Sequence, residues 1–407
     1  MTGVRKAIVV GGGIAGPVAA LALRRAGIEP TVHEAYGTTA DGVGGAFMLA
    51  PNGLAALRII GLDEQVQAIG QPIGRMSIDD PRGRRLAEFA GVPGLAPSRL
   101  LWRTELYALL QERLRQEGIP VTYGQRLVGA DETPDGITAR FADGSTADGD
   151  LLVGADGVRS TVRTLIDPAA PGPRNVGLVG FGGFSDHVPA GSPDHDVMHF
   201  ANGRRAFFGW WTVPEGGSAW FSNLPHKELM TPAQAREVPA AEWLERLREQ
   251  HAGDAPAEDV LRRARPDTVV NVGSMHILPK VPRWYRSRMV LVGDSVHAPS
   301  PSSGQGASLA VESAVQLARC LRDLPALPDA FAAYEALRRD RVEKIIAQAE
   351  KTNNEKAAGP LARTMTRLLA PVALRTFLTP EKMFGPVHRY AIDWDAPVTP
   401  AGATTAV

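Results

Sequence analysis

Cysteine, net charge and long apolar segments are what this sequence has least of. The chain of 407 residues contains one cysteine, Cys320, which excludes an internal disulfide framework and a zinc site built on several thiolates. Lysine plus arginine and aspartate plus glutamate both number 44, so the formal net charge is zero and no overall basic field attracts nucleic acid or an anionic membrane. No apolar run approaches the length of a bilayer span. We therefore expect no nucleic-acid partner, no membrane span and no metal site.

The length and the remaining composition are those of a globular protein of two or three domains. Hydrophobic residues make up 44% of the chain and charged residues 22%, which is ordinary for soluble domains. The first residues lead directly into an apolar segment, so we expect no signal peptide. We expect a cytoplasmic protein that is a monomer or a homodimer.

The chain is organised around a glycine-rich turn near its N-terminus. Residues 7–10 are apolar and predict a short buried strand, and Gly11, Gly13 and Gly16 follow in G-x-G-x-x-G spacing before a helix of small residues. Glu34 ends the next predicted strand, as the acid of a dinucleotide-binding βαβ unit does. The N-terminus of the helix offers unpaired N–H groups and a positive dipole end to phosphates. The pattern predicts a nucleotide site and does not distinguish NAD from FAD.

Two later segments repeat the order of strand, glycine turn and helix. In the first, Gly154-Ala155-Asp156-Gly157, Asp156 has two interpretations: it caps the following helix, or it contacts a cofactor phosphate or ribose. In the second, a buried strand ends at Gly293-Asp294, and Gly304-Gln305-Gly306 begins a long helix whose N-terminus is another anion site. A further glycine-rich loop at 42–45 is either a flexible turn or a segment that passes close to a flat ligand.

Aromatic residues gather between the second and third motifs, where residues 176–224 predict several strands. Because successive residues of a strand face opposite sides, Phe208 and Trp210 share one face and Phe207 and Trp211 share the other. We expect one pair to line a cavity, and we favour Phe208 and Trp210 because Gly209 leaves the opposite face open for close packing.

The other segments predict supporting structure. Spacing of apolar residues indicates helices over 54–62, 101–117, 239–251 and 330–351, with more helix up to about residue 377. Period-two alternation from residue 121 to 152 predicts a β-meander of three or four strands. The tail after Ala396 is expected to be disordered.

Taken together and in this order, the three motifs resemble those of class A flavoprotein monooxygenases of the para-hydroxybenzoate hydroxylase type. The match is to compact two-domain members such as tetracycline-modifying and salicylate-type hydroxylases, and it extends over about residues 7–325. The resemblance implies an α/β fold with a Rossmann-like FAD-binding domain of the glutathione-reductase type, an inserted mixed β-sheet substrate domain and a C-terminal helical segment. The implied divisions are 1–72, 97–173 and 274–327 for FAD, 73–96 and 174–273 for substrate, 328–396 for the C-terminal helices, and 397–407 for the tail.

The resemblance also implies which residues bind ligands. The residues expected to hold FAD without a covalent bond are Gly11, Gly13, Ile14, Ala15, Gly16, Glu34, Ala35, Gly45, Ala46, Arg103, Leu127, Asp156, Asp294, Gly304, Gly306 and Ala307. The residues expected to contact substrate are Phe208, Trp210, Phe221 and Pro301. No catalytic side chain is required, and His297, the one candidate, has structural support of its loop as the alternative role.

The implied reaction is hydroxylation of an aromatic or polycyclic small molecule. NAD(P)H reduces FAD, and O2 then forms a flavin C4a-hydroperoxide whose terminal oxygen enters the ring. Flavin-dependent halogenases share the fold, but residues 209–214 read Gly-Trp-Trp-Thr-Val-Pro, without the first tryptophan of the halogenase segment, and no lysine occurs between Lys6 and Lys227. A reductase or dehydrogenase acting on prenyl chains would need no O2, and a non-catalytic nucleotide-binding module would not consume NAD(P)H.

Overall fold

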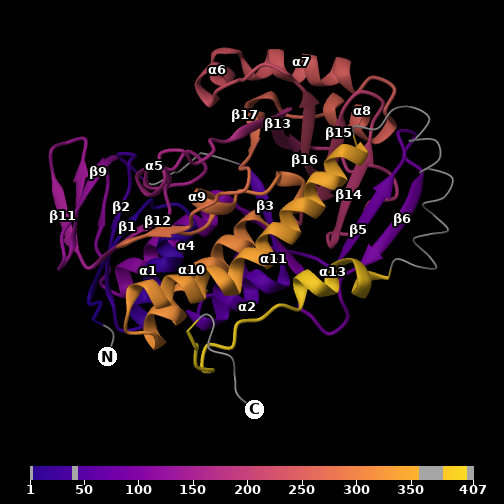
Figure 1. Cartoon of the computed structure of the whole chain (residues 1–407). Coiled ribbons are helices and arrows are strands. Elements are labelled where there is room, and N and C mark those ends of the chain that lie inside the picture. The colour runs from indigo at the N-terminus through magenta and orange to yellow at the C-terminus, as the bar shows by residue number, and fades with distance from the viewer. Residues whose placement is uncertain (1–2, 39–44, 357–378, 401–407) are drawn as a thin grey trace.

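The protein is described by a computed structural model that covers residues 3–38, 45–356 and 379–400 (Figure 1). Its first layer is a six-stranded sheet in the order β18-β19-β12-β1-β2-β8, in which all neighbours except β18 and β19 are parallel. The strands are β1 (Lys6–Val10), β2 (Glu29–His33), β8 (Val121–Thr122), β12 (Leu151–Gly154), β18 (Tyr285–Arg286) and β19 (Met289–Leu291). Almost every residue of β1, β12 and β19 is buried, as expected for a parallel sheet covered on both faces.

Helices rich in small residues cover this sheet. Helix α1 (Ala15–Arg25) is buried from Ala15 to Leu23 and packs against α10 (Gly306–Asp323). Alanines along α1 let the two helices approach closely, and their apolar faces form the main core. Helix α11 (Leu327–Lys356) runs beside α10, as Figure 1 shows in orange.

The predicted meander is confirmed as a separate three-stranded antiparallel sheet. Its strands are β9 (Leu127–Glu132), β10 (Ile137–Phe141) and β11 (Thr146–Gly149). The chain then enters β12 and passes through α5 (Thr161–Ile166) toward the second large sheet.

The second large sheet has seven strands in the order β17-β13-β16-β15-β14-β5-β6. They are β5 (Arg75–Asp79), β6 (Arg85–Ala90), β13 (Arg174–Ser185), β14 (Val197–Asn202), β15 (Phe207–Thr212), β16 (Ser218–Pro225) and β17 (Val270–Ile277). Helices α6 (Pro232–Glu237), α7 (Ala240–Gln250) and α8 (Ala255–Arg262) lie at its outer side (Figure 1). Apart from the second half of β17, which extends past residue 273, these strands come from the two segments predicted for a substrate domain. The division into domains stays a prediction.

A small sheet joins the two parts of the molecule. It has the order β3-β7-β4, with β3 (Ala46–Leu49), β4 (Gln71–Ile73) and β7 (Ser98–Trp102). Two helices, α2 (Pro51–Ile59) and α3 (Asp63–Ile69), connect β3 to β4, and α4 (Arg103–Gln116) follows β7 directly. The short helix α9 (Asp294–His297) precedes α10, and α13 (Pro380–His388) lies near β5 and β6 in Figure 1.

The expected disorder of the tail is wrong for its first residues. The Asp323 carboxylate accepts a hydrogen bond from the Val398 N–H at 2.8 Å, and Arg319 donates to the Ala396 carbonyl at 2.7 Å. Val398 itself is buried in the main core, so this segment packs back onto α10. Residues 401–407 lie outside the described residues, and so does most of the helix expected up to residue 377.

The described residues offer neither a membrane-spanning helix nor a cluster of metal-ligating side chains. Among the described residues, no helix is long and apolar enough to cross a membrane. Within the same ranges, no group of three or more His, Cys, Asp and Glu side chains is placed to hold a metal ion.

Candidate active site

The three glycine motifs meet at one edge of the parallel sheet. Val10, the last residue of β1, lies beside Gly154 of β12, and Gly154 lies beside Leu291 of β19. Parallel strands end at the same edge, so the loops that follow all three strands start next to one another. This edge is where open α/β sheets bind their ligands.

Within the first motif, the glycines have different surroundings. Gly11 has a φ of 109°, and a Cβ there or at Gly16 would overlap backbone, because Gly11 meets the Ala155 carbonyl and Gly16 meets the Gly11 carbonyl. Gly13 is open: the nearest atom to a Cβ at this position is the Tyr107 hydroxyl, 3.9 Å away. Gly11 and Gly16 therefore hold the turn itself, and Gly13 leaves backbone free to meet a ligand.

Glu34 closes over this turn from the end of β2. Its Oε2 accepts a hydrogen bond from the Gly12 N–H at 2.6 Å, and its Oε1 accepts one from the Tyr36 N–H at 2.9 Å. The carboxylate is partly exposed and each oxygen has a further lone pair, so it is able to accept hydrogen bonds from a ribose as well.

In the second motif, Asp156 has the first of the two roles considered for it: it caps the helix that follows. Its carboxylate accepts hydrogen bonds from the Thr161 and Val162 N–H groups at 2.7 and 3.1 Å and from the Ser160 hydroxyl at 2.5 Å. Burial raises the pKa of Asp156, and these hydrogen bonds oppose that rise. The contact of Asp156 with a cofactor stays a prediction.

Arg163 ties the second motif to the third. Its guanidinium donates to the Ser295 carbonyl at 2.8 Å and to the Val158 carbonyl at 2.8 Å, and the residue is buried. Gly293 in the third motif, with φ 64°, approaches α1 so closely that a Cβ there would stand 2.8 Å from the Ala15 Cβ. The three loops thus form one packed unit.

Asp294 and Arg103 supply the charge of this unit. Surrounding protein raises the pKa of Asp294, and the nearby positive charge of Arg103 opposes that rise. The Asp294 side chain is nevertheless exposed to solvent. The Nε of Arg103 is buried and has no hydrogen-bond partner among the described residues. An unpaired buried N–H is costly, and an acceptor on a bound cofactor would satisfy it.

The first turn of α10 offers further unpaired donors. Its N-cap residue, Gln305, makes no side-chain capping bond, and Gly304 before it has a φ of 60°. The N–H groups of Gly306 and Ala307 belong to this turn, where a helix has no intrahelical acceptor. The residues present therefore fit FAD: a glycine cradle at one end of the site, and a helix N-terminus with an unpaired arginine N–H at the other.

A buried charge network fixes that helix end. Asn52 donates to the Gln305 side-chain oxygen at 3.1 Å and to Glu312 at 2.7 Å. Arg338 and Arg341 form ion pairs with Glu312 at 2.6 and 2.9 Å. Burial favours a raised pKa for Glu312, but the two arginines outweigh it and leave the pKa lowered. Sequence motifs gave no signal for this network, because its members come from three distant segments.

The preference for Phe208 and Trp210 as cavity residues is wrong. Both are fully buried in the cluster beneath α7 and α8, together with Trp220 and Trp243. Helices α7 and α8 pack directly on this face of the sheet and cover both side chains. Gly209 permits close packing, as expected: the ring of Phe221 covers it on the face of the sheet opposite to Phe208 and Trp210.

The other face of the sheet carries the aromatic wall. We use "inner face" for the side of β13–β16 that bears Phe184, Phe200, Trp211 and Phe221. The Trp102 ring lies 5.0 Å from Phe184 and 6.3 Å from Trp211, centroid to centroid. Because Trp102 immediately precedes Arg103, the inner face adjoins the charged end of the site. Phe221 keeps its predicted place, and its role with substrate stays a prediction.

The remaining predicted residues have varied settings. His297 is buried, lies 2.8 Å from the Ser313 hydroxyl through Nε2, and has its pKa lowered to about 3 by burial. This setting supports the structural alternative. Pro301 is exposed in the loop before α10, and Leu127 is buried at the start of β9. Ala46 pairs with Trp102 across β3 and β7, next to the open Gly45; residues 42–44 lie outside the described residues.

Comparisons with known proteins agree with this geometry. The FAD-binding domain family matches residues 5–349. The aurachin C monooxygenase/isomerase of Stigmatella aurantiaca is 33% identical over 84% of this chain and 86% of its own length. An FAD-dependent urate hydroxylase of Klebsiella pneumoniae is 32% identical over 85% of this chain and 89% of its own. The crystal structure of Klebsiella pneumoniae HpxO with FAD and uric acid superposes with a TM-score of 0.81, at 27% identity over 95% of this chain and 96% of that one.

The relatives are monooxygenases and hydroxylases, which favours oxygen insertion over the halogenase and reductase alternatives. The family match covers most of the chain, and two relatives exceed 30% identity over more than four-fifths of it. The chain belongs to the FAD-binding domain family and is an FAD-dependent monooxygenase.

Proposed function

We propose that this enzyme hydroxylates an aromatic small molecule with O2, using NAD(P)H as reductant, at a site between the inner face and the edge where the three motifs meet. The observation that carries the proposal is the convergence of the motifs beside a wall of aromatic rings. The glycine turn and Glu34 hold the ADP half of the cofactor. Arg103, Asp294 and the first turn of α10 hold the flavin half.

Bound FAD supplies hydride acceptance and the activation of O2. The N-terminus of α10 offsets negative charge on a reduced cofactor without a side-chain cation. The Nε of Arg103 gains from the cofactor the acceptor that it lacks among residues 3–38, 45–356 and 379–400. The aromatic wall orients a flat substrate and excludes water from the reaction. None of these tasks needs a general acid or base, and His297 is assigned to loop support.

The test is a turnover assay on purified protein. The protein is expected to be yellow and to release FAD on denaturation. NAD(P)H oxidation is then followed with and without a panel of aromatic compounds that includes urate, with O2 uptake and product mass as further measurements. Stimulated oxidation with a product heavier by one oxygen atom supports hydroxylation. Stimulated oxidation that continues without O2 uptake contradicts it and favours a reductase. We keep a monomer or homodimer as part of the proposal.

A further inference from the structure

Helix α4 carries a tyrosine whose hydroxyl group the protein core does not use. The buried side of this helix consists of Leu106, Tyr107, Leu110 and Leu114. Only 8% of Tyr107 is exposed, and among the described residues its hydroxyl has no hydrogen-bond partner. A buried tyrosine hydroxyl usually has one, and phenylalanine would fill this position of the apolar stripe equally well. The hydroxyl group therefore needs an explanation other than packing.

This hydroxyl lies in front of the glycine turn of the first motif. Helix α4 packs against α1, and the first turn of α1 follows Gly13 in the chain. The Tyr107 hydroxyl oxygen is 3.9 Å from the position that a Cβ of Gly13 would take, and no other side chain of the described residues comes within 4 Å of that position. The space at Gly13 thus has glycine backbone on one side and a phenol hydroxyl on the other.

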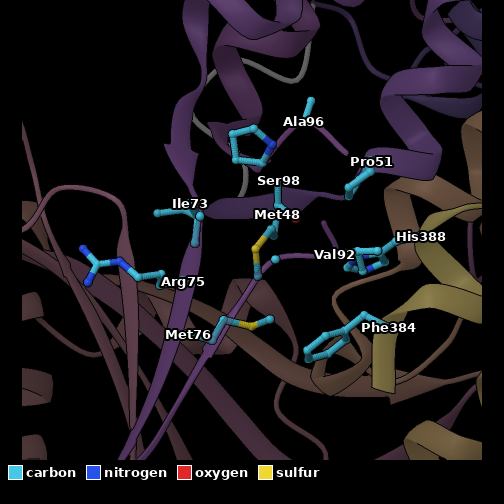
Figure 2. Close-up of a pocket in the computed structure, with 13 residues that line it drawn as sticks. Met48, Pro51, Ile73, Arg75, Met76, Val92, Ala96, Ser98, Phe384 and His388 are labelled. Atoms are coloured by element: carbon cyan, nitrogen blue, oxygen red, sulfur yellow. The ribbon is translucent and has the colours of Figure 1, made fainter. Parts of the chain in front are cut away.

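This space is distinct from the cavity in Figure 2, which Met48, Met76 and Phe384 help to line. That cavity has a volume of about 20 Å³, which is room for about one water molecule. The space at Gly13 lies instead where the three motifs meet, and Gly13 is partly exposed. A ligand bound at this edge of the sheet is therefore able to contact both the Gly13 backbone and the Tyr107 hydroxyl.

Arg103 precedes Tyr107 by one helical turn on the same face of α4. Residues four apart in a helix lie on one side of it, separated by about 6 Å along the axis. The Nε of Arg103 is buried and has no partner within the described residues, and the Arg103 charge acts on Asp294. One face of α4 therefore presents two unused donors, one toward the Asp294 end of the site and one toward the Gly13 end.

A phosphate group suits the space between Gly13 and Tyr107. Its oxygens accept hydrogen bonds, and both the N–H groups of the first turn of α1 and the tyrosine hydroxyl donate them. The positive dipole end of α1 favours an anion there. A hydroxyl group also donates more strongly to a charged oxygen than to a neutral one.

We propose that Tyr107 binds the diphosphate of FAD, with its hydroxyl donating a hydrogen bond to a phosphate oxygen held over Gly13. Helix α4 then contacts both halves of the cofactor, through Arg103 at the flavin half and Tyr107 at the ADP half. The inference rests on the placement of the ADP half in the proposed function. It gives Tyr107 a role that the sequence motifs did not indicate.

The experiment measures the affinity of FAD-free protein for two probes, FAD and ADP. FAD binding is followed by the change in flavin fluorescence, and ADP binding by competition with FAD. Tyr107→Phe removes the hydroxyl and keeps the ring, so the melting temperature of the FAD-free protein should stay at the wild-type level. We expect this variant to bind both probes roughly tenfold more weakly, because it loses one hydrogen bond to a charged acceptor.

Two variants serve as controls. Tyr285→Phe removes a hydroxyl at the β18 edge of the six-stranded sheet, where the Tyr285 ring packs on Phe331, and it should leave both affinities unchanged. Asp294→Asn acts on the flavin half, so it should weaken FAD binding and leave ADP binding unchanged.

Several outcomes would overturn the assignment of Tyr107. They are unchanged affinities in Tyr107→Phe, a loss for FAD without a loss for ADP, an equal loss in Tyr285→Phe, and wild-type protein from which ADP does not displace FAD. Failure of the proposed function has a different signature. Wild-type protein that binds both probes, but whose NAD(P)H oxidation no aromatic compound stimulates, would contradict the proposed function and leave the assignment of Tyr107 standing.

Discussion

Gly16 packs so tightly on Gly11 that any side chain at position 16 would overlap the Gly11 carbonyl oxygen. Three residues before Gly16, Gly13 has open space around it. The same motif therefore contains one glycine that the fold requires and one that a ligand requires. This difference separates folding from cofactor binding in a single experiment.

Gly16→Ala should destabilise the protein itself. Overpacking of this kind costs about 1–3 kcal/mol, and the turn has no flexible side chain that could move aside. Gly13→Ala should leave the melting temperature of the FAD-free protein unchanged and reduce FAD occupancy, because the added methyl enters the space reserved for the pyrophosphate. Thermal unfolding of both apo-proteins and their flavin content provide the measurement; equal FAD affinity in wild type and Gly13→Ala would contradict the assignment.

Asp294→Asn should weaken FAD without harming the apo-protein. A charge-assisted hydrogen bond is worth about 1.5–3 kcal/mol, so FAD affinity should fall roughly tenfold or more. Burial raises the pKa of the Asp294 carboxyl group, so the folded state binds the carboxyl proton more tightly than the unfolded state does. The stability that this bound proton contributes is lost as pH rises through the folded pKa. The variant should therefore lose less stability than wild type as pH rises above about 4, which urea unfolding of the apo-proteins measures.

The sequence was enough to predict the parts of the site that are local in the chain. A glycine turn after a buried strand requires particular backbone conformations, and Gly11, Gly293 and Gly304 have the positive φ values that such turns need. A capping role could be offered for Asp156 as one of two alternatives because its partners lie within six residues of it.

The parts that could not be predicted depend on contacts between distant segments. Alternation in β15 showed that Phe208 and Trp211 face opposite sides, but not which side α7 and α8 would cover. The Glu312 network and the His388–Gln305 contact join residues far apart in the chain. No local pattern distinguishes such residues from ordinary surface or core positions.

The stability of the apo-protein should fall in mild acid because of His297. Burial lowers the pKa of this histidine from 6.5 to about 3, so between these values the unfolded chain binds a proton that the folded chain does not. The contribution is fully present above pH 6.5 and is lost as pH falls, at about 1.4 kcal/mol per pH unit. His297→Asn should show a shallower decline between pH 6.5 and 5 in urea unfolding; parallel declines would contradict this account.

The two faces of the aromatic sheet give the sharpest test of where the substrate lies. Phe208 is fully buried beneath α7 and α8, so Phe208→Ala should cost about 3–5 kcal/mol of unfolding free energy and leave the ratio of product formed to NAD(P)H consumed unchanged. Phe221 is partly exposed on the inner face, so Phe221→Ala should cost less stability and lower that ratio, because water reaches the reacting oxygen more easily. The pair is well matched: both are phenylalanines on adjacent strands, β15 and β16, that lie on opposite faces. Coupling ratios and melting temperatures of the two variants are measured side by side with the same stimulating compound. If Phe208→Ala lowers the ratio and Phe221→Ala does not, the substrate lies on the helix-covered side and the inner face is only core.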